Sequence, residues 1–134
     1  MSDEYSFSVR TRVAFSDTDA QGVVYYGRYN PYFDLARAEW LRSLGLLHRG
    51  SEDEEFVMRA NDVEYFAPAR FDDELEIHVR TRFGRTSMTF EFAAFKMPDK
   101  TLLVTAHQTL VFIDRATRRP VEIPPTYREP FGVG

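Results

Sequence analysis

One stretch of this chain has the periodicity of a helix. Elsewhere the apolar residues mostly alternate with polar ones. Between Tyr29 and Leu47 the apolar residues recur at a spacing of three or four, which predicts an amphipathic helix. Residues 5–15 and 74–83 instead alternate between apolar and polar side chains, as half-buried strands do. One helix combined with several strands is typical of an α+β domain, which is the fold class that we predict.

Turn-forming residues indicate where the helix begins and ends. Asn30 and Pro31 suit its N-cap and its first position. Gly45 suits the position just after a helix that ends near Leu44. A turn over residues 24–28 is expected to extend the helix at its front.

The remaining elements are strands, which pack most economically as one antiparallel sheet wrapped around the helix. The 134 residues fit one domain, residues 1–134, and no repeat or linker divides them. Such a sheet leaves an edge strand unpaired, so dimerisation edge to edge is expected. The proline-rich tail, residues 114–134, shows no clear period. Strands are predicted over residues 5–15, 56–67, 74–83, 86–96 and 101–113.

Composition excludes several functional classes. The chain has no Cys, so disulfides, thiol chemistry and zinc sites built on Cys are all excluded. No apolar run reaches the roughly 18 residues that span a bilayer, and the acidic start lacks the apolar stretch of a signal peptide. We therefore expect a cytoplasmic protein without a membrane span. The net charge of −4 argues against a nucleic-acid partner. The three histidines have no metal-ligand spacing: His48, His78 and His107.

The loop before the helix carries two carboxylates, Asp17 and Asp19, within about ten residues of the helix start. Free N–H groups at a helix N-terminus favour developing negative charge. A thioester hydrolase needs a carboxylate near the carbonyl carbon and hydrogen-bond donors on the carbonyl oxygen. Turn and capping residues have the same composition, so the residues alone leave both interpretations open.

Two motifs resemble the 4-hydroxybenzoyl-CoA thioesterase family of hotdog-fold proteins, and most of all its acyl-CoA thioesterase subfamily found beside the Tol-Pal envelope genes. The resemblance runs from about residue 7 to residue 128. The second motif is Val63-Glu64-Tyr65 followed by residues 67–75. The first motif matches at Asp17, Asp19, Gly22, Val24, Tyr29, Ala36 and Arg37.

The resemblance implies a hotdog fold, a homodimer or homotetramer, and hydrolysis of acyl-CoA without a metal or cofactor. It places the catalytic carboxylate at Asp19 and the oxyanion donor at the backbone N–H near Tyr26. Many members of that subfamily have His where this chain has Tyr26, but any residue except proline supplies the N–H. Asp19 could act as nucleophile or as general base. Asp17 is expected to hold the loop.

The family binds the CoA phosphates near the turn between the third and fourth strands. By this resemblance Arg85 and Ser87 are the expected contacts, with Arg82 as a further candidate. The Arg guanidinium supplies positive charge and two parallel N–H donors, and Ser supplies a hydroxyl. A solvated hairpin with surface Arg is the alternative interpretation. Glu39 is expected to face Arg42 or solvent. Core packing is predicted for Tyr65, Phe66 and Phe71, with an acyl pocket as the alternative.

Three other functions remain possible at this point. A hotdog protein could bind acyl-CoA or an acyl-carrier protein without hydrolysis. A hotdog dehydratase usually needs a His near the helix, and this segment has none. A scaffold protein would make the two matched motifs coincidental.

Overall fold

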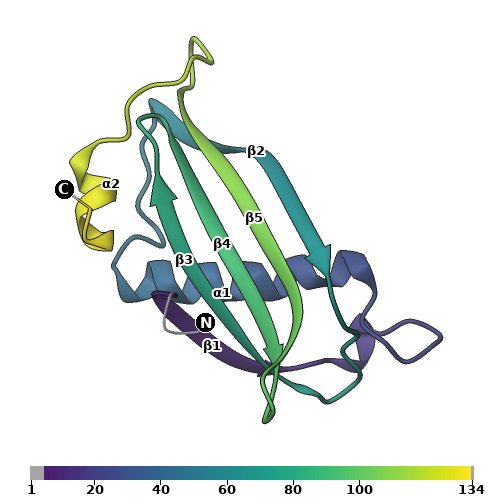
Figure 1. The fold of residues 1–134 in the computed structure, drawn as a ribbon. Coiled ribbons are helices and arrows are strands. Elements are labelled where there is room, and N and C mark those ends of the chain that lie inside the picture. The colour runs from purple at the N-terminus through teal and green to yellow at the C-terminus, as the bar shows by residue number, and fades with distance from the viewer. Residues whose placement is uncertain (1–4, 134) are drawn as a thin grey trace.

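One antiparallel sheet curves around one long helix in the computed structural model, which describes residues 5–133 (Figure 1). This confirms the predicted α+β hotdog fold. No helix among the described residues is long and apolar enough to cross a membrane. The main elements are β1 (Phe7–Arg12), α1 (Tyr29–Ser43), β2 (Glu54–Tyr65), β3 (Glu74–Phe83), β4 (Ser87–Lys96), β5 (Thr101–Asp114) and α2 (Pro125–Arg128). Short 3-10 turns cover Phe15–Asp17, Tyr26–Arg28 and Glu129–Phe131.

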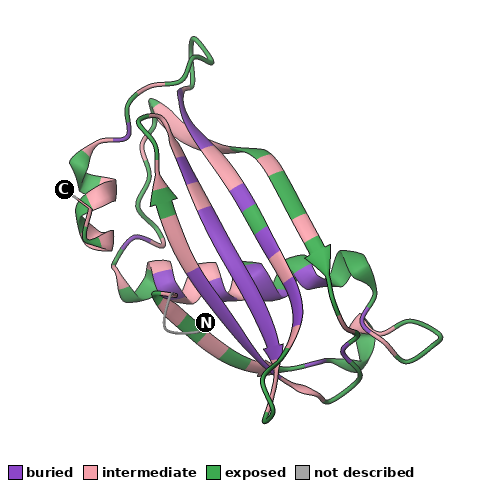
Figure 2. Cartoon of the chain, in the orientation of Figure 1, coloured by how far each residue is buried: buried purple, intermediate pink, exposed green. Residues whose placement is uncertain are grey.

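The five strands lie in the order β1-β3-β4-β5-β2, and every neighbouring pair is antiparallel. The strand after the helix, β2, therefore forms one edge and pairs only with β5 among the described strands. Its register shifts between Met58 and Ala60, where one extra residue makes a bulge. Both edge strands, β1 and β2, have fewer buried residues than the central strands β3 and β4 (Figure 2).

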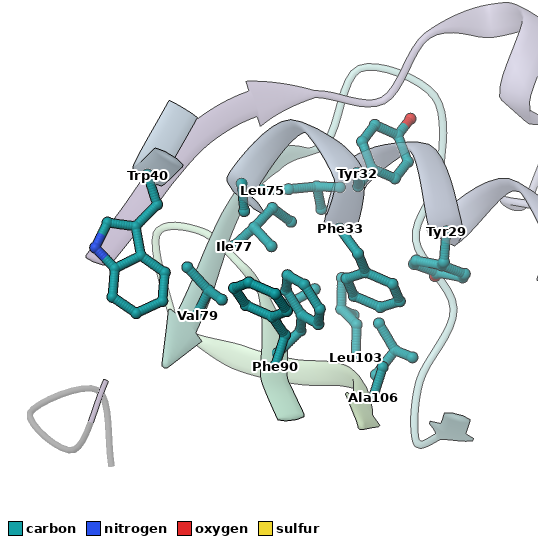
Figure 3. Close-up of a cluster of buried hydrophobic side chains, with 14 of the residues drawn as sticks. Tyr29, Tyr32, Phe33, Trp40, Leu75, Ile77, Val79, Phe90, Leu103 and Ala106 are labelled. Atoms are coloured by element: carbon teal, nitrogen blue, oxygen red, sulfur yellow. The ribbon is translucent and has the colours of Figure 1, made fainter. Parts of the chain in front are cut away.

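The core lies between α1 and the face of the sheet that the helix covers. Phe33 has 0% of its surface exposed, and its ring centroid is 5.0 Å from that of Phe92 on β4. Figure 3 shows side chains of α1 and of the sheet meeting in this cluster. The buried residues of the helix follow its three- and four-residue spacing: Tyr29, Tyr32, Phe33, Ala36 and Trp40.

Two local predictions need correction, and the tail adds a short helix. The first strand ends at Arg12, and Phe15 is 75% exposed because residues 15–17 turn away from the sheet. The helix N-cap is Arg28, and Asn30 lies inside the helix. The tail contains the short helix α2, which begins at Pro125 and is too short to produce a visible period. The predicted end of the helix is confirmed, with Gly45 at φ 74°.

The outer face of the sheet carries two buried carboxylates, and Glu76 on β3 is the first. Arg10 Nε donates to Glu76 Oε2 at 3.0 Å, and His78 Nε2 lies 2.7 Å from Oε1. His78 is on the polar face of its strand, as expected, yet it is only 6% exposed because the rings of Tyr5 and Phe95 flank it. Burial acts to raise the pKa of Glu76, but its bonds to His78 and Arg10 outweigh burial and leave that pKa lowered.

Glu91 on β4 is the second buried carboxylate. Arg80 Nε donates to its Oε1 at 2.7 Å, and Arg82 Nη2 lies 3.0 Å from its Oε2. His107 Nε2 also lies 3.2 Å from Oε2. Burial raises the pKa of Glu91, while Arg80, Arg82 and His107 lower it, and the net pKa is below its ordinary value.

Both carboxylates should make the protein sensitive to acid. Their pKa values in the unfolded chain are near the ordinary 4.5, and folding lowers both. Their contribution to stability is therefore fully present above about pH 4.5 and is lost as pH falls through the lowered folded values. Urea unfolding between about pH 7 and about pH 3 should show the loss. Glu91→Gln should weaken the dependence of the unfolding free energy on pH. A loss of stability at low pH equal to that of the wild type would contradict this prediction.

Candidate functional site

The loop that precedes α1 folds against the segment between β2 and β3. Val24 N–H donates to the Ala69 carbonyl at 2.8 Å, and Val23 bridges to Arg70. A tight turn closes within the loop, because Asp19 N–H donates to the Val23 carbonyl at 2.9 Å. Gly22 completes the turn at φ 80°, a conformation that favours glycine. These bonds hold Asp19 in a tight turn of the loop that precedes the helix.

Asp17 ties the loop to the helix. The hydroxyl of Tyr32, a buried residue of α1, donates to Asp17 Oδ2 at 2.5 Å. Arg28 Nε lies 3.9 Å from Asp17 Oδ1. Burial of Tyr32, together with this bond, raises its pKa, so the hydroxyl stays protonated and donates. The contacts agree with the structural role that the sequence predicts for Asp17.

Asp19 is exposed and accepts hydrogen bonds at one carboxylate oxygen. Its Oδ1 accepts from Gln21 N–H at 2.8 Å and from Val23 N–H at 3.4 Å. Among residues 5–133, no hydrogen bond is made to Oδ2. Asp19 thus fills the turn role that composition indicates while one oxygen remains available for chemistry.

The start of the helix presents free backbone donors. Residues Tyr26–Arg28 form a 3-10 turn that leads directly into α1. The first N–H groups of a helix have no partner within it. Those of Tyr26 and Gly27 find no carbonyl partner elsewhere in the part of the chain that the structure describes. Oriented N–H groups of this kind can stabilise an oxyanion.

Asp19 and the helix start border the same cavity, which we call the Asp19 cavity. It has a volume of about 710 Å³. The Tyr65 hydroxyl donates to the Tyr26 carbonyl at 3.2 Å, so the end of β2 closes one side. The two rings lie 4.7 Å apart. The lining residues are 19–21, 23–26, Tyr29 and 65–68.

The aromatic residues after β2 were predicted to lie in the core, and the structure corrects this. Tyr65 and Phe66 are 44% and 54% exposed and line the Asp19 cavity. Phe71 is 55% exposed and packs edge-on against Phe15 at 5.7 Å. Tyr65 and Phe66 fall where β2 ends, shortly before Pro68, and this position at a strand end was a sequence signal against a place in the core.

The predicted phosphate contacts lie at the β3–β4 turn. The Arg85 side chain is 76% exposed, and its Nε lies 3.6 Å from Glu122 Oε1. The Arg82 guanidinium instead pairs with Glu91. Gly84 N–H donates to the Ser87 carbonyl at 2.8 Å, which closes the turn.

The turn and the Asp19 loop are not brought together within one chain. The loop contacts residues just before β3, and the turn follows the other end of that 10-residue strand. At about 3.3 Å per residue, roughly 30 Å separates the two ends.

Arg128 in α2 holds the turn in place, and sequence reasoning missed this residue. Its Nη2 donates to the carbonyls of Gly84 at 2.7 Å and of Arg85 at 3.0 Å. Its Nε donates to the Ile123 carbonyl at 2.8 Å. The aperiodic tail gave no signal for these long-range contacts.

The remaining sequence candidates lie elsewhere. Glu39 pairs with Arg42 on the exposed face of the helix, as expected. His107 pairs with Glu91 on the outer face of the sheet. Within residues 5–133, no group of three or more His, Asp or Glu side chains is arranged to hold a metal ion.

Known proteins resemble this chain in sequence and in fold. A family model described as the thioesterase-like superfamily matches residues 13–131. The acyl-CoA thioester hydrolase YbgC of Escherichia coli O6:H1 is 38% identical over 116 residues, which cover 84% of this chain and 86% of that protein. The acyl-CoA thioesterase YbgC of Haemophilus influenzae is 30% identical over 128 residues and 93% of each chain.

Solved structures show the same architecture. The crystal structure of a hypothetical protein from Aquifex aeolicus aligns with a TM-score of 0.82 and 32% identity, over 94% of this chain and 99% of that one. A 1,4-dihydroxy-2-naphthoyl-CoA thioesterase from Synechocystis aligns with a TM-score of 0.85 over 94% of this chain and 95% of that one. Its identity is 22%, so this second likeness concerns the fold alone.

Proposed function

Because this chain belongs to the thioesterase-like superfamily and is a thioester hydrolase like its curated relatives, we propose that it cleaves acyl-CoA with Asp19 as the catalytic carboxylate. The observation that carries this proposal is that Asp19 and Tyr26, whose backbone N–H finds no carbonyl partner among the described residues, border one cavity. No metal or cofactor takes part in the proposed reaction. A cytoplasmic location, and kinship with the subfamily encoded beside the Tol-Pal genes, belong to the same proposal.

The reaction follows from these groups. The thioester oxygen accepts from the N–H of Tyr26, with that of Gly27 beside it, and these donors stabilise the negative charge that develops there. Asp19 either removes a proton from an attacking water or attacks the carbonyl carbon itself. The second route forms a mixed anhydride that water then opens. Either way the C–S bond breaks, CoA leaves as a thiol, and the acyl group leaves as a carboxylate.

Thiol release from a panel of acyl-CoA thioesters, followed with a thiol reporter such as DTNB, tests this function. Turnover on at least one acyl-CoA supports it. Binding of acyl-CoA without release of thiol would favour the alternative of a non-hydrolytic acyl-CoA or acyl-carrier-protein binding protein. No interaction with any acyl-CoA would overturn both.

Arg85→Ala should raise KM for acyl-CoA and leave kcat nearly unchanged. We propose that Arg85 and Ser87, with Arg82 as a weaker third contact, bind the CoA phosphates, far from the thioester. Such a contact stabilises ground and transition states alike. A loss of about 1–3 kcal/mol in binding is expected for a charge-assisted bond. Because Arg85 is exposed, the effect should shrink at high salt.

Steady-state kinetics at low and high salt measure this effect. Arg82→Ala is the matched control, since the Arg82 guanidinium is already bound to Glu91. It should change KM less than Arg85→Ala does. An unaltered KM for Arg85→Ala at low salt would place the phosphate site elsewhere.

We also propose that the enzyme is a homodimer, or a homotetramer built from such dimers, joined through β2. This edge strand has two exposed apolar side chains, Met58 at 48% and Tyr65 at 44%, and an unpaired strand edge invites pairing. Light scattering should give at least about twice the 15.6 kDa of one chain. A stable and active monomer at micromolar concentration would contradict this prediction.

A further inference from the structure

The end of the edge strand β2 lies beside the start of α1, as the arrowhead of β2 shows in Figure 1. Tyr65 is the last residue of this strand. Its hydroxyl donates to the Tyr26 carbonyl at 3.2 Å. Its ring centroid lies 4.7 Å from that of Tyr26 and 5.8 Å from that of Tyr29. In the reaction proposed above, Tyr65 only closes one side of the Asp19 cavity.

The turn that carries the proposed oxyanion donors has no capping side chain. Among the described residues, neither the 3-10 turn Tyr26–Arg28 nor α1 has a hydrogen bond from the side chain of its N-cap residue. A capping side chain would accept one of the first N–H groups and so occupy it. Its absence leaves the N–H groups of Tyr26 and Gly27 available, but it also leaves the turn without that support. Gly27 adds freedom, because glycine restrains the backbone least.

Tyr65 supports the turn through a carbonyl group instead. The Tyr26 carbonyl accepts the Tyr29 N–H, which closes the turn, and it also accepts the Tyr65 hydroxyl. A carbonyl oxygen has two lone pairs, so it can accept both. The peptide group is planar and trans, so a bond that orients the Tyr26 carbonyl also orients the Gly27 N–H, which points the opposite way. Polarisation through the same peptide group makes this N–H a stronger donor.

The strand gives the Tyr65 hydroxyl a fixed position. Tyr65 pairs with Val104 of β5, which has 0% of its surface exposed. The next residue, Phe66, donates its N–H to the Leu103 carbonyl at 2.8 Å. The Tyr26 side chain, by contrast, is 66% exposed and does not anchor the turn in the core. The sheet therefore holds the turn through Tyr65.

We propose that Tyr65 is a positioning residue for thioester hydrolysis, whose hydroxyl holds the Tyr26–Gly27 peptide group so that the Gly27 N–H donates to the developing oxyanion beside that of Tyr26. This inference rests on the proposed hydrolysis of acyl-CoA and adds a residue that sets the direction and strength of one oxyanion donor. Negative charge on the thioester oxygen develops in the transition state. The contribution of Tyr65 therefore belongs to kcat rather than to KM.

Tyr65→Phe tests this role, because it removes the hydroxyl and keeps the ring. It should lower kcat on the best acyl-CoA by about tenfold and change KM by less than about twofold. Loss of a direct oxyanion donor costs about a hundredfold or more, and an indirect bond costs less. Tyr5→Phe is the matched control, because the Tyr5 ring lies under Arg80 on the outer face of the sheet. It should keep the wild-type kcat.

The pH dependence of kcat separates positioning from direct proton transfer, since Tyr65 also lines the Asp19 cavity. A positioning residue exchanges no proton with the substrate. Tyr65→Phe should therefore lower kcat by the same factor at every pH between about 5 and about 10. If the variant instead lost a decline of kcat at high pH that the wild type shows, Tyr65 would be a catalytic proton donor and the inference would be overturned.

Nuclear magnetic resonance gives a second readout that needs no substrate. The chain has 7 Gly, so labelling glycine with nitrogen-15 gives few amide signals, and the signal that Gly27→Ala lacks is that of Gly27. Loss of a hydrogen bond to the preceding carbonyl changes the polarisation of an amide. Tyr65→Phe should therefore shift the Gly27 signal more than that of Gly84. An unmoved Gly27 signal would show that the hydroxyl does not hold this peptide group and would overturn the inference.

The kinetic outcomes separate this inference from the proposed function. Turnover by the wild type together with an unchanged kcat in Tyr65→Phe would overturn the role of Tyr65 while hydrolysis stands. Absence of thiol release by the wild type on every acyl-CoA would overturn the proposed function, and the catalytic role of Tyr65 with it.

Discussion

Asp19→Asn should reduce kcat at least about a hundredfold on the best acyl-CoA substrate, while the protein stays folded. The amide is nearly isosteric with the carboxylate, and its oxygen can still accept the bonds from Gln21 and Val23 N–H. The variant loses negative charge, basicity and nucleophilicity. The general-base route requires basicity and the nucleophilic route requires nucleophilicity, so the substitution disables both. Steady-state thiol release gives kcat, and circular dichroism checks the fold.

Asp17→Asn is the matched control, two residues away in the same loop. It should cost less activity and more stability, because Asp17 accepts the short bond from the buried Tyr32. Near-full turnover by Asp19→Asn would show that another group does the chemistry. Glu39, the helix carboxylate, would be tested next, although its pairing with Arg42 on the exposed face argues against it.

Phe33→Ala should lower the free energy of unfolding by about 3–5 kcal/mol. The ring is completely buried and packs on Phe92 between the helix and the sheet, so truncation leaves a cavity that the surrounding core cannot fill. Domains of this size are stable by only about 5–15 kcal/mol. Denaturant unfolding at an unchanged m-value measures the loss.

Phe71→Ala provides the comparison for this core truncation. The same atoms are removed, but Phe71 is 55% exposed and touches Phe15 at the surface. Its loss should stay below about 1 kcal/mol. Similar losses in both variants would mean that the helix and sheet do not pack through Phe33 as described.

The architecture could be predicted because each main element has its own period. The alternation over 74–83 matches the observed bounds of β3, and the helix ends at Ser43, two residues before the predicted glycine. Where a residue has a partner that is distant in the sequence, prediction failed. Asn30 suits an N-cap by its chemistry, but the helix starts one residue before it and its side chain bonds to Asn61 on β2. Only the folded sheet brings that partner near.

For the candidate site, the loop that contains Asp19 could be predicted from the sequence, whereas the contacts that surround it could not. The motif located Asp19 and the helix start, which border one cavity. Arg128, however, holds the β3–β4 turn from 43 and 44 positions away in the sequence. A cavity of about 410 Å³ at the C-terminal end of α1 likewise combines segments that lie far apart in the sequence. Contacts of such sequence separation leave no periodic signal, because they depend on how the sheet curves rather than on local spacing.

The bulged edge strand also affects the protein's solubility. An unpaired edge is a template on which further chains can add without limit. Here the bulge after Met58 twists the strand, and exposed charges follow it at Arg59, Asp62 and Glu64. Together they disfavour long, flat pairing with arbitrary strands while permitting one short, symmetric contact. Conditions that neutralise these charges, or that dissociate the proposed dimer, would therefore expose the protein to aggregation through β2 before the core unfolds.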